Sequence, residues 1–85
     1  MIARELIPTQ RAFGLAVRTQ RERQDISQED LAYRCGLHRT YVGSVERGER
    51  NISLQNIHLI AAAMEMTASE LLRMAEAIQS RSKAD

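Results

Sequence analysis

The chain has 85 residues, which is enough for one small domain but too few for two that each bury a core. Its 44% hydrophobic and 27% charged residues are ordinary for a soluble protein, and its four glycines, one proline and 4% aromatic residues favour an all-α domain over a sandwich or barrel. No apolar run is long enough to cross a membrane, no signal peptide is visible at the start, and one cysteine cannot form an internal disulfide. We therefore expect a cytoplasmic protein without a membrane partner.

The formal net charge of +1 is unevenly distributed along the chain. Residues 1–50 carry nine basic and seven acidic side chains, whereas residues 51–85 carry three and four. Eleven of the twelve basic residues are arginines, whose planar donors suit phosphates and guanine edges. Composition alone leaves two readings open, DNA binding and an ordinary arginine-rich helix surface.

Caps and hydrophobic periodicity predict five helices, at about 10–24, 28–35, 39–47, 54–64 and 68–79. Their start signals, in chain order, are Pro8 with Thr9 as N-cap, Ser27, the turn before Arg39, Ser53, and a capping box of Thr67 and Glu70. The second and third helices end at Gly36 and Gly48, and Asp25 stands in the first turn. We expect a flexible segment at 1–8, the folded domain at 9–79 and a frayed tail at 80–85.

Residues 28–47 form the most informative segment, because two short helices are joined there by a turn that contains Gly36. This is the arrangement of a helix-turn-helix, whose second helix enters the DNA major groove. Ala32 lets the helices cross closely, and Gly36 allows the positive φ of the turn. The inward positions are apolar (Leu31, Cys35, Leu37, Val42 and Val45), and the outward positions of the second helix are polar (Arg39, Thr40, Tyr41, Ser44 and Arg47). An ordinary helical hairpin is the alternative, but it does not require all of these residue types at these positions.

The motif assigns roles to individual side chains. We expect base contacts in the major groove of double-stranded DNA from Arg39, Thr40 and Ser44, with Arg39 paired to a guanine edge. A contact with phosphate alone is the competing role for Arg39. We expect contacts with the DNA backbone from Gln28, Tyr41, Arg47, Arg50 and Asn51. A simple exposed or loop position is the competing reading for Gln28 and Arg50.

Three segments carry a family resemblance: SQEDLA at 27–32, RTYVGSVERGERN at 39–51 and SLQNIHLIA at 53–61. They resemble the Cro/C1-type (XRE) helix-turn-helix regulators and, within this group, are most similar to controller proteins of restriction–modification systems. The resemblance implies a compact five-helix, lambda-repressor-like DNA-binding domain. It implies a dimeric bacterial regulator on the nucleoid that binds a pseudo-palindromic operator and controls its own gene and an endonuclease gene.

The same resemblance implies an ion pair between Arg21 and Glu46, which would join the first helix to the third. Four positions depart from the family pattern: Asp25 and Glu65 stand where glycine is common, Gln20 where leucine is usual and Ile52 where proline is frequent. The functional alternative is an antitoxin-like or phage-type regulator that binds a protein partner and represses its own gene. Neighbouring genes would distinguish the two.

The last helix carries more apolar residues than one side of a small monomer needs. Leu71, Met74, Ala75 and Ile78 lie on one stripe, Leu72 widens it and Met66 lies near its start. This pattern favours a homodimer interface with two-fold symmetry. The alternative is that the helix closes the core of its own chain, and both roles are compatible.

A metal site and a catalytic site are both disfavoured. Cys35 and His38 have a CxxH spacing, but Cys35 takes an inward helix position and His58 is the only other strong ligand. Structural zinc needs four such ligands. No cofactor is expected, the chain is not expected to be an enzyme, and no effector domain for a small molecule is visible.

Overall fold

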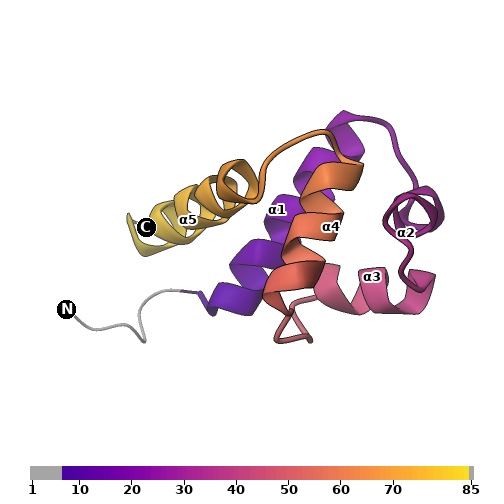
Figure 1. Ribbon diagram of the computed structural model, residues 1–85. Helices are drawn as coiled ribbons and strands as arrows, with labels where there is room; N and C mark the ends of the chain where they lie inside the picture. The colour runs from indigo at the N-terminus through magenta and orange to yellow at the C-terminus, as the bar shows by residue number, and fades with distance from the viewer. Residues whose placement is uncertain (1–6, 85) are drawn as a thin grey trace.

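The computed structural model describes residues 7–84, with side chains described as far as Arg81. Within this range the chain is all-α and has no strand. The elements are α1 (Thr9–Arg23), α2 (Gln28–Cys35), α3 (Arg39–Glu46), α4 (Leu54–Ala63) and α5 (Ala68–Ala84). Figure 1 shows α2 and α3 on one side of the molecule and α5 on the other. No helix in the described range has the length and apolar character needed to span a bilayer.

Side-chain caps fix the starts of three helices where the sequence predicts them. The Ser27 hydroxyl accepts the Asp30 N–H at 3.0 Å, and the Ser53 hydroxyl accepts the Asn56 N–H at 3.1 Å. The capping box of α5 is complete, because the Thr67 hydroxyl accepts the Glu70 N–H at 3.0 Å and Glu70 Oε1 accepts the Thr67 N–H at 2.8 Å.

The first four helices all end with the same pair of backbone hydrogen bonds, known as the Schellman motif. In α2, for example, the Leu37 N–H reaches the Ala32 carbonyl and the Gly36 N–H reaches the Tyr33 carbonyl. The motif needs one residue with positive φ, which is Gly36 at 71° and Gly48 at 79°. At the ends of α1 and α4 this residue is Asp25 at 58° and Glu65 at 59°, neither of which is a glycine.

One continuous core joins the five helices. α1 packs against α3 and α5, α2 packs against α3 and α4, and α4 packs against α5. The α1–α3 contact is close because Gly14 has no side chain: a Cβ there would overlap the Val45 carbonyl oxygen. The largest fully buried side chains are Leu31, Ile60, Met64, Leu71, Val17, Val42 and Val45. The close approach of α1 and α3 at Gly14 fixes α3 against the longer α1.

Two sequence predictions are wrong in detail. α5 does not end at about Gln79 but continues through Ala84, over a stretch that contains no glycine or proline. The frayed tail at 80–85 stays a prediction. Pro8 and not Thr9 is the N-cap of α1, without a side-chain cap. Leu54, in the first turn of α4, is 70% exposed. The predicted segment 1–8 lies mostly outside the described residues.

Candidate nucleic-acid interface

The unit formed by α2, the Gly36 turn and α3 has the geometry that the motif predicts. Gly36 takes the left-handed conformation, and the predicted inward residues Leu31, Ala32 and Cys35 of α2 are buried. Val42 and Val45 of α3 are buried with them. Exposure on α3 is concentrated at its first turn, at Arg39 and Thr40, because residues 42–46 are all buried. Figure 1 shows α3 at the edge of the molecule.

Arg39 and Thr40 stand exposed at the first turn of α3. The Arg39 side chain is 70% exposed, and its nearest carboxylate is Glu29 of α2, with Nη1 and Oε2 3.9 Å apart. An ion pair this long and this exposed holds the guanidinium only weakly. Both side chains are therefore free to reach a ligand that approaches the start of α3.

Ser44 does not face outward, so its predicted outward position is wrong. It is buried, its hydroxyl donates to the Tyr41 carbonyl at 2.7 Å, and it accepts from Arg50 Nε at 3.0 Å. The cause is tertiary, because the loop after α3 brings Arg50 back over the helix. The Arg50 guanidinium also lies 5.3 Å from the centre of the Tyr41 ring, a cation–π contact.

Tyr41 is half-buried and joins α3 to α4. Its hydroxyl accepts from Asn56 Nδ2 at 3.0 Å, and its ring packs against the core. Asn51 is exposed and lines a hollow with residues of α1, α4 and α5. The structure thus groups Tyr41 with Arg50, and gives no such contact for Asn51.

The ion pair between Arg21 and Glu46 is present and is largely buried. Arg21 Nε and Nη2 meet the two Glu46 oxygens at 2.6 and 3.0 Å, with side-chain exposures of 12% and 3%. Glu46 also accepts from Gln28 Nε2 at 2.9 Å, and Arg21 donates to the Ile26 carbonyl at 2.8 Å. The hydrogen bonds from Arg21 to Glu46 raise the pKa of Arg21 above its ordinary value. This network ties α1, α2 and α3 together and engages the side-chain amide of Gln28.

Arg47 lies at the end of α3, beside Gln28. A Cβ built on Gly43 would lie 3.2 Å from Arg47 Nη1 and 3.6 Å from Gln28 Oε1, so both side chains flank this glycine. Arg47 pairs with Glu49, whose hydrogen bonds raise the pKa of Arg47 and whose own pKa is lowered by them. Gln28 and Arg47 therefore share one side of α3.

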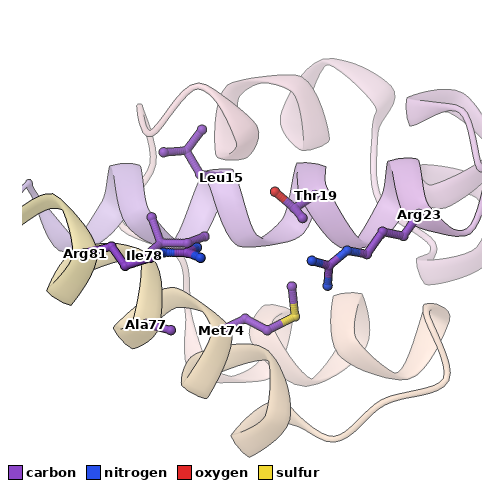
Figure 2. Close-up of a pocket in the computed structure, with 7 residues that line it drawn as sticks. All are labelled: Leu15, Thr19, Arg23, Met74, Ala77, Ile78 and Arg81. Carbon is purple, nitrogen blue, oxygen red and sulfur yellow. The ribbon is translucent and has the colours of Figure 1, made fainter.

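The apolar residues of α5 divide into core and surface. Leu71 and Ala75 are buried in the core of their own chain, so the prediction that they form a dimer interface is wrong. Met74 and Ile78 are partly buried against the core, and Figure 2 shows them facing Leu15 and Thr19 of α1 across a shallow groove. Most of the apolar stripe of α5 therefore packs against α1.

Among the described residues, three of the four exposed large apolar side chains (Leu54, Leu59 and Leu72) lie on α4 and at the start of α5, and the fourth, Tyr33, lies on α2. Leu54 is 70% exposed and Leu72 is 37% exposed, and both line one surface hollow. The hollow also includes His58, Ala62 and Met66. We call this set, Leu54, His58, Ala62, Met66 and Leu72, the α4–α5 face. The α4 residues of this face, Leu54, His58 and Ala62, recur at every fourth position and so share one side of the helix. Sequence reasoning missed this spacing.

Cys35 is buried as predicted, and its thiol donates to the Leu31 carbonyl at 3.0 Å. Burial raises the pKa of this thiol. In the part of the chain that the structure describes, no three His, Cys, Asp or Glu side chains gather where they could hold a metal ion. Cys35 is therefore a packing residue.

Comparison with known proteins agrees with this geometry. A helix-turn-helix family model matches residues 17–71. The chain belongs to this family. Over 61 residues, or 71% of this chain and 75% of the relative, it is 48% identical to control protein C.BamHI of Bacillus amyloliquefaciens. The predicted resemblance to restriction–modification controller proteins is confirmed, and the chain is a transcription regulator and not an enzyme.

Solved structures support the same assignment. The restriction–modification controller C.AhdI of Aeromonas hydrophila superposes with a TM-score of 0.72 at 47% identity, covering 73% of this chain and 94% of that one. The controller C.Esp1396I superposes with a TM-score of 0.78 at 26% identity, covering 85% and 95%. That protein was solved as a tetramer in complex with its natural 35-base-pair operator. The predicted all-α helix-turn-helix fold is confirmed.

Proposed function

We propose that this regulator binds a specific DNA operator by inserting the start of α3 into the major groove. The exposure of Arg39 and Thr40 on the helix that buries Val42 and Val45 carries the proposal. Arg39 would pair its planar donors with O6 and N7 of a guanine. Thr40 would contact a neighbouring base edge or a thymine methyl group. Ser44 is not assigned a base contact, because its hydroxyl is engaged within the chain.

Contacts with the DNA backbone would position α3 in the groove. The first N–H groups of α2, at Gln28, have no partner within the helix and suit a phosphate. This contact would use the backbone of Gln28, since its side chain is bonded to Glu46. Arg47 and the stacked pair of Arg50 and Tyr41 would meet phosphates on either side of α3. Asn51 remains a candidate from the sequence alone.

We assign the homodimer interface to the α4–α5 face. Leu54 and Leu72 are the large apolar side chains exposed next to each other there, and exposed apolar surface on a small domain marks an association site. A second copy is the partner we assign, because an isologous pair would present two recognition helices about 34 Å apart, one turn of DNA. Of the residues predicted from the sequence, we assign Met66 and Leu72 to this interface, whereas Met74 and Ile78 line the separate groove against α1.

The restriction–modification role is the specific regulatory function that we favour. The likeness to C.BamHI and C.AhdI supports it. In this role the protein acts on the bacterial nucleoid in the cytoplasm and controls its own gene and that of an endonuclease. Methyltransferase and endonuclease genes beside its own gene are the expected arrangement, whereas a neighbouring toxin gene would favour the antitoxin alternative.

In vitro selection of bound duplexes from a random library tests this function. We expect enrichment of a pseudo-palindrome whose half-sites are centred about 10 base pairs apart and contain a guanine. The Arg39→Ala protein, selected in parallel, should lose the preference for that guanine. Failure of the wild-type protein to enrich any sequence would contradict a role as a sequence-specific regulator.

A further inference from the structure

A surface hollow of about 370 Å³ lies between α1 and the end of α3. Three arginines line it (Arg11, Arg18 and Arg47), together with Leu15 and two glutamates (Glu46 and Glu49). Glu46 is committed to Arg21 and Gln28. Glu49 therefore supplies the exposed carboxylate that lies in this basic hollow.

Glu49 binds Arg47 through a two-bond fork. Arg47 Nε donates to Oε2 at 3.0 Å and Arg47 Nη2 donates to Oε1 at 3.2 Å. Arginine binds phosphate with the same planar pair of donors. A DNA phosphate and the Glu49 carboxylate therefore compete for the same two N–H groups.

The backbone holds Glu49 in this position. Its N–H donates to the Ser44 carbonyl at 3.0 Å, as part of the Schellman motif at the end of α3. Gly48, at a φ of 79°, makes the turn, and a Cβ there would lie 2.8 Å from the Cα of Arg11. The turn is thus packed against α1, and only the side chain of Glu49 is free to leave Arg47.

The fork contributes little to folding. The Arg47 and Glu49 side chains are 60% and 55% exposed, so water screens their attraction. The matching fork of Arg21 and Glu46 already ties α3 to α1. The exposed fork of Arg47 and Glu49 is therefore not needed to hold α3 against α1.

We propose that Glu49 is an internal stand-in for a DNA phosphate, which occupies Arg47 in the free protein and must be exchanged for a phosphate when DNA binds. This inference rests on the proposed function. The exchange lowers affinity for any duplex, because Arg47 loses one anionic partner as it gains another and the displaced carboxylate stays near the phosphates. Glu49 thereby limits non-specific binding, which depends on phosphate contacts alone.

The test compares Glu49→Gln with wild type and with the control Glu65→Gln. Both variants remove one negative charge, but Glu65 lies in the turn after α4 and is not among the residues that line the hollow. The probe is a labelled duplex of random sequence, about 30 base pairs or three helical turns long, titrated over a series of salt concentrations. Thermal unfolding of each variant checks that the fold is intact.

We expect Glu49→Gln to bind the random duplex about threefold more tightly per protomer at low salt than Glu65→Gln. The slope of log K against log salt should steepen by up to about one per protomer. In an Arg47→Gln background, Glu49→Gln should gain less over Glu65→Gln than it gains in the wild-type background, because only the repulsion between the carboxylate and the phosphates is then relieved. Equal affinities of the two single variants would overturn the stand-in role and leave DNA binding untouched. If wild type binds no duplex, both the proposed function and this inference fail.

Discussion

The region of α1–α3 and the region of α4–α5 differ in what determines their function. In α1–α3, polar side chains occupy positions that caps, glycines and ion pairs fix, so each role is tied to one residue. In α4–α5, neighbouring apolar residues differ only in which way they point: Leu71 is fully buried and Leu72 is 37% exposed. Most roles in the first region are readable from residue type, with Ser44 as an exception, whereas those in the second emerge only from packing.

The largest expected effect is on the network that holds α3 to α1. Glu46→Ala should lower the free energy of unfolding by about 3 kcal/mol, because it leaves the Arg21 charge largely buried and unpaired. Glu49→Ala is the matched control, because it breaks the exposed fork between Arg47 and Glu49. It should change the free energy of unfolding by less than about 0.5 kcal/mol. Urea denaturation measures both. Equal losses would show that burial does not distinguish the two forks.

The adjacent leucines of α5 separate core from interface. Leu71→Ala should cost about 3 kcal/mol of folding stability, because it leaves a cavity among buried residues, while the folded variant still dimerises. Leu72→Asp should leave the folded monomer intact but abolish dimerisation, with DNA affinity about 100-fold weaker as the two half-sites lose their link. Sedimentation and denaturation distinguish these outcomes. A dimeric Leu72→Asp protein would place the interface elsewhere.

On α3, base contacts and phosphate contacts should separate in their dependence on DNA sequence. Arg39→Ala should lose about 1–3 kcal/mol on the selected operator and much less on scrambled DNA. Arg47→Ala should weaken binding to both DNAs about equally and reduce the salt slope by about one per protomer. Filter binding over a salt series provides both numbers. An equal loss on both DNAs for Arg39→Ala would reduce Arg39 to a phosphate contact.

The smallest effect concerns the turn between α4 and α5. Glu65 has a φ of 59°, which costs a residue with a Cβ more than it costs glycine. Glu65→Gly should therefore raise the free energy of unfolding by about 0.5 kcal/mol, the strain relief being partly offset by the entropy of glycine in the unfolded chain. Thermal unfolding measures the shift. A clear loss of stability would mean that the Glu65 side chain makes a contribution that outweighs its backbone strain.

Sequence reasoning predicted the first four helices to within one residue at each end, because caps and left-handed turn residues are local signals. It also identified the exposed Arg39 and Thr40 from the motif, and the Arg21–Glu46 pair from the family resemblance. It misplaced Ser44, because the loop that returns Arg50 over α3 is a tertiary feature without a local pattern. The Arg47–Glu49 fork escaped notice for the same reason, as its geometry depends on how Gly48 packs on α1.

The apolar residues of α5 show a second limit. Their stripe was read correctly, but periodicity does not say whether a stripe meets its own chain or another. The structure pairs most of it with α1, as the facing residues in Figure 2 show, and leaves the exposed surface on the α4–α5 face. Leu54 shows the same limit, because its helical spacing in α4 does not reveal that it is 70% exposed at the first turn.

The most direct test of the central claim is the affinity of the wild-type protein for its selected operator and for a scrambled duplex of equal length, measured at one physiological salt concentration. Sequence recognition by α3 predicts binding to the operator at least about 1,000-fold tighter than to the scrambled duplex. Equal affinities for the two duplexes would mean that the protein contacts only the phosphate backbone, and would contradict base recognition by Arg39 and Thr40.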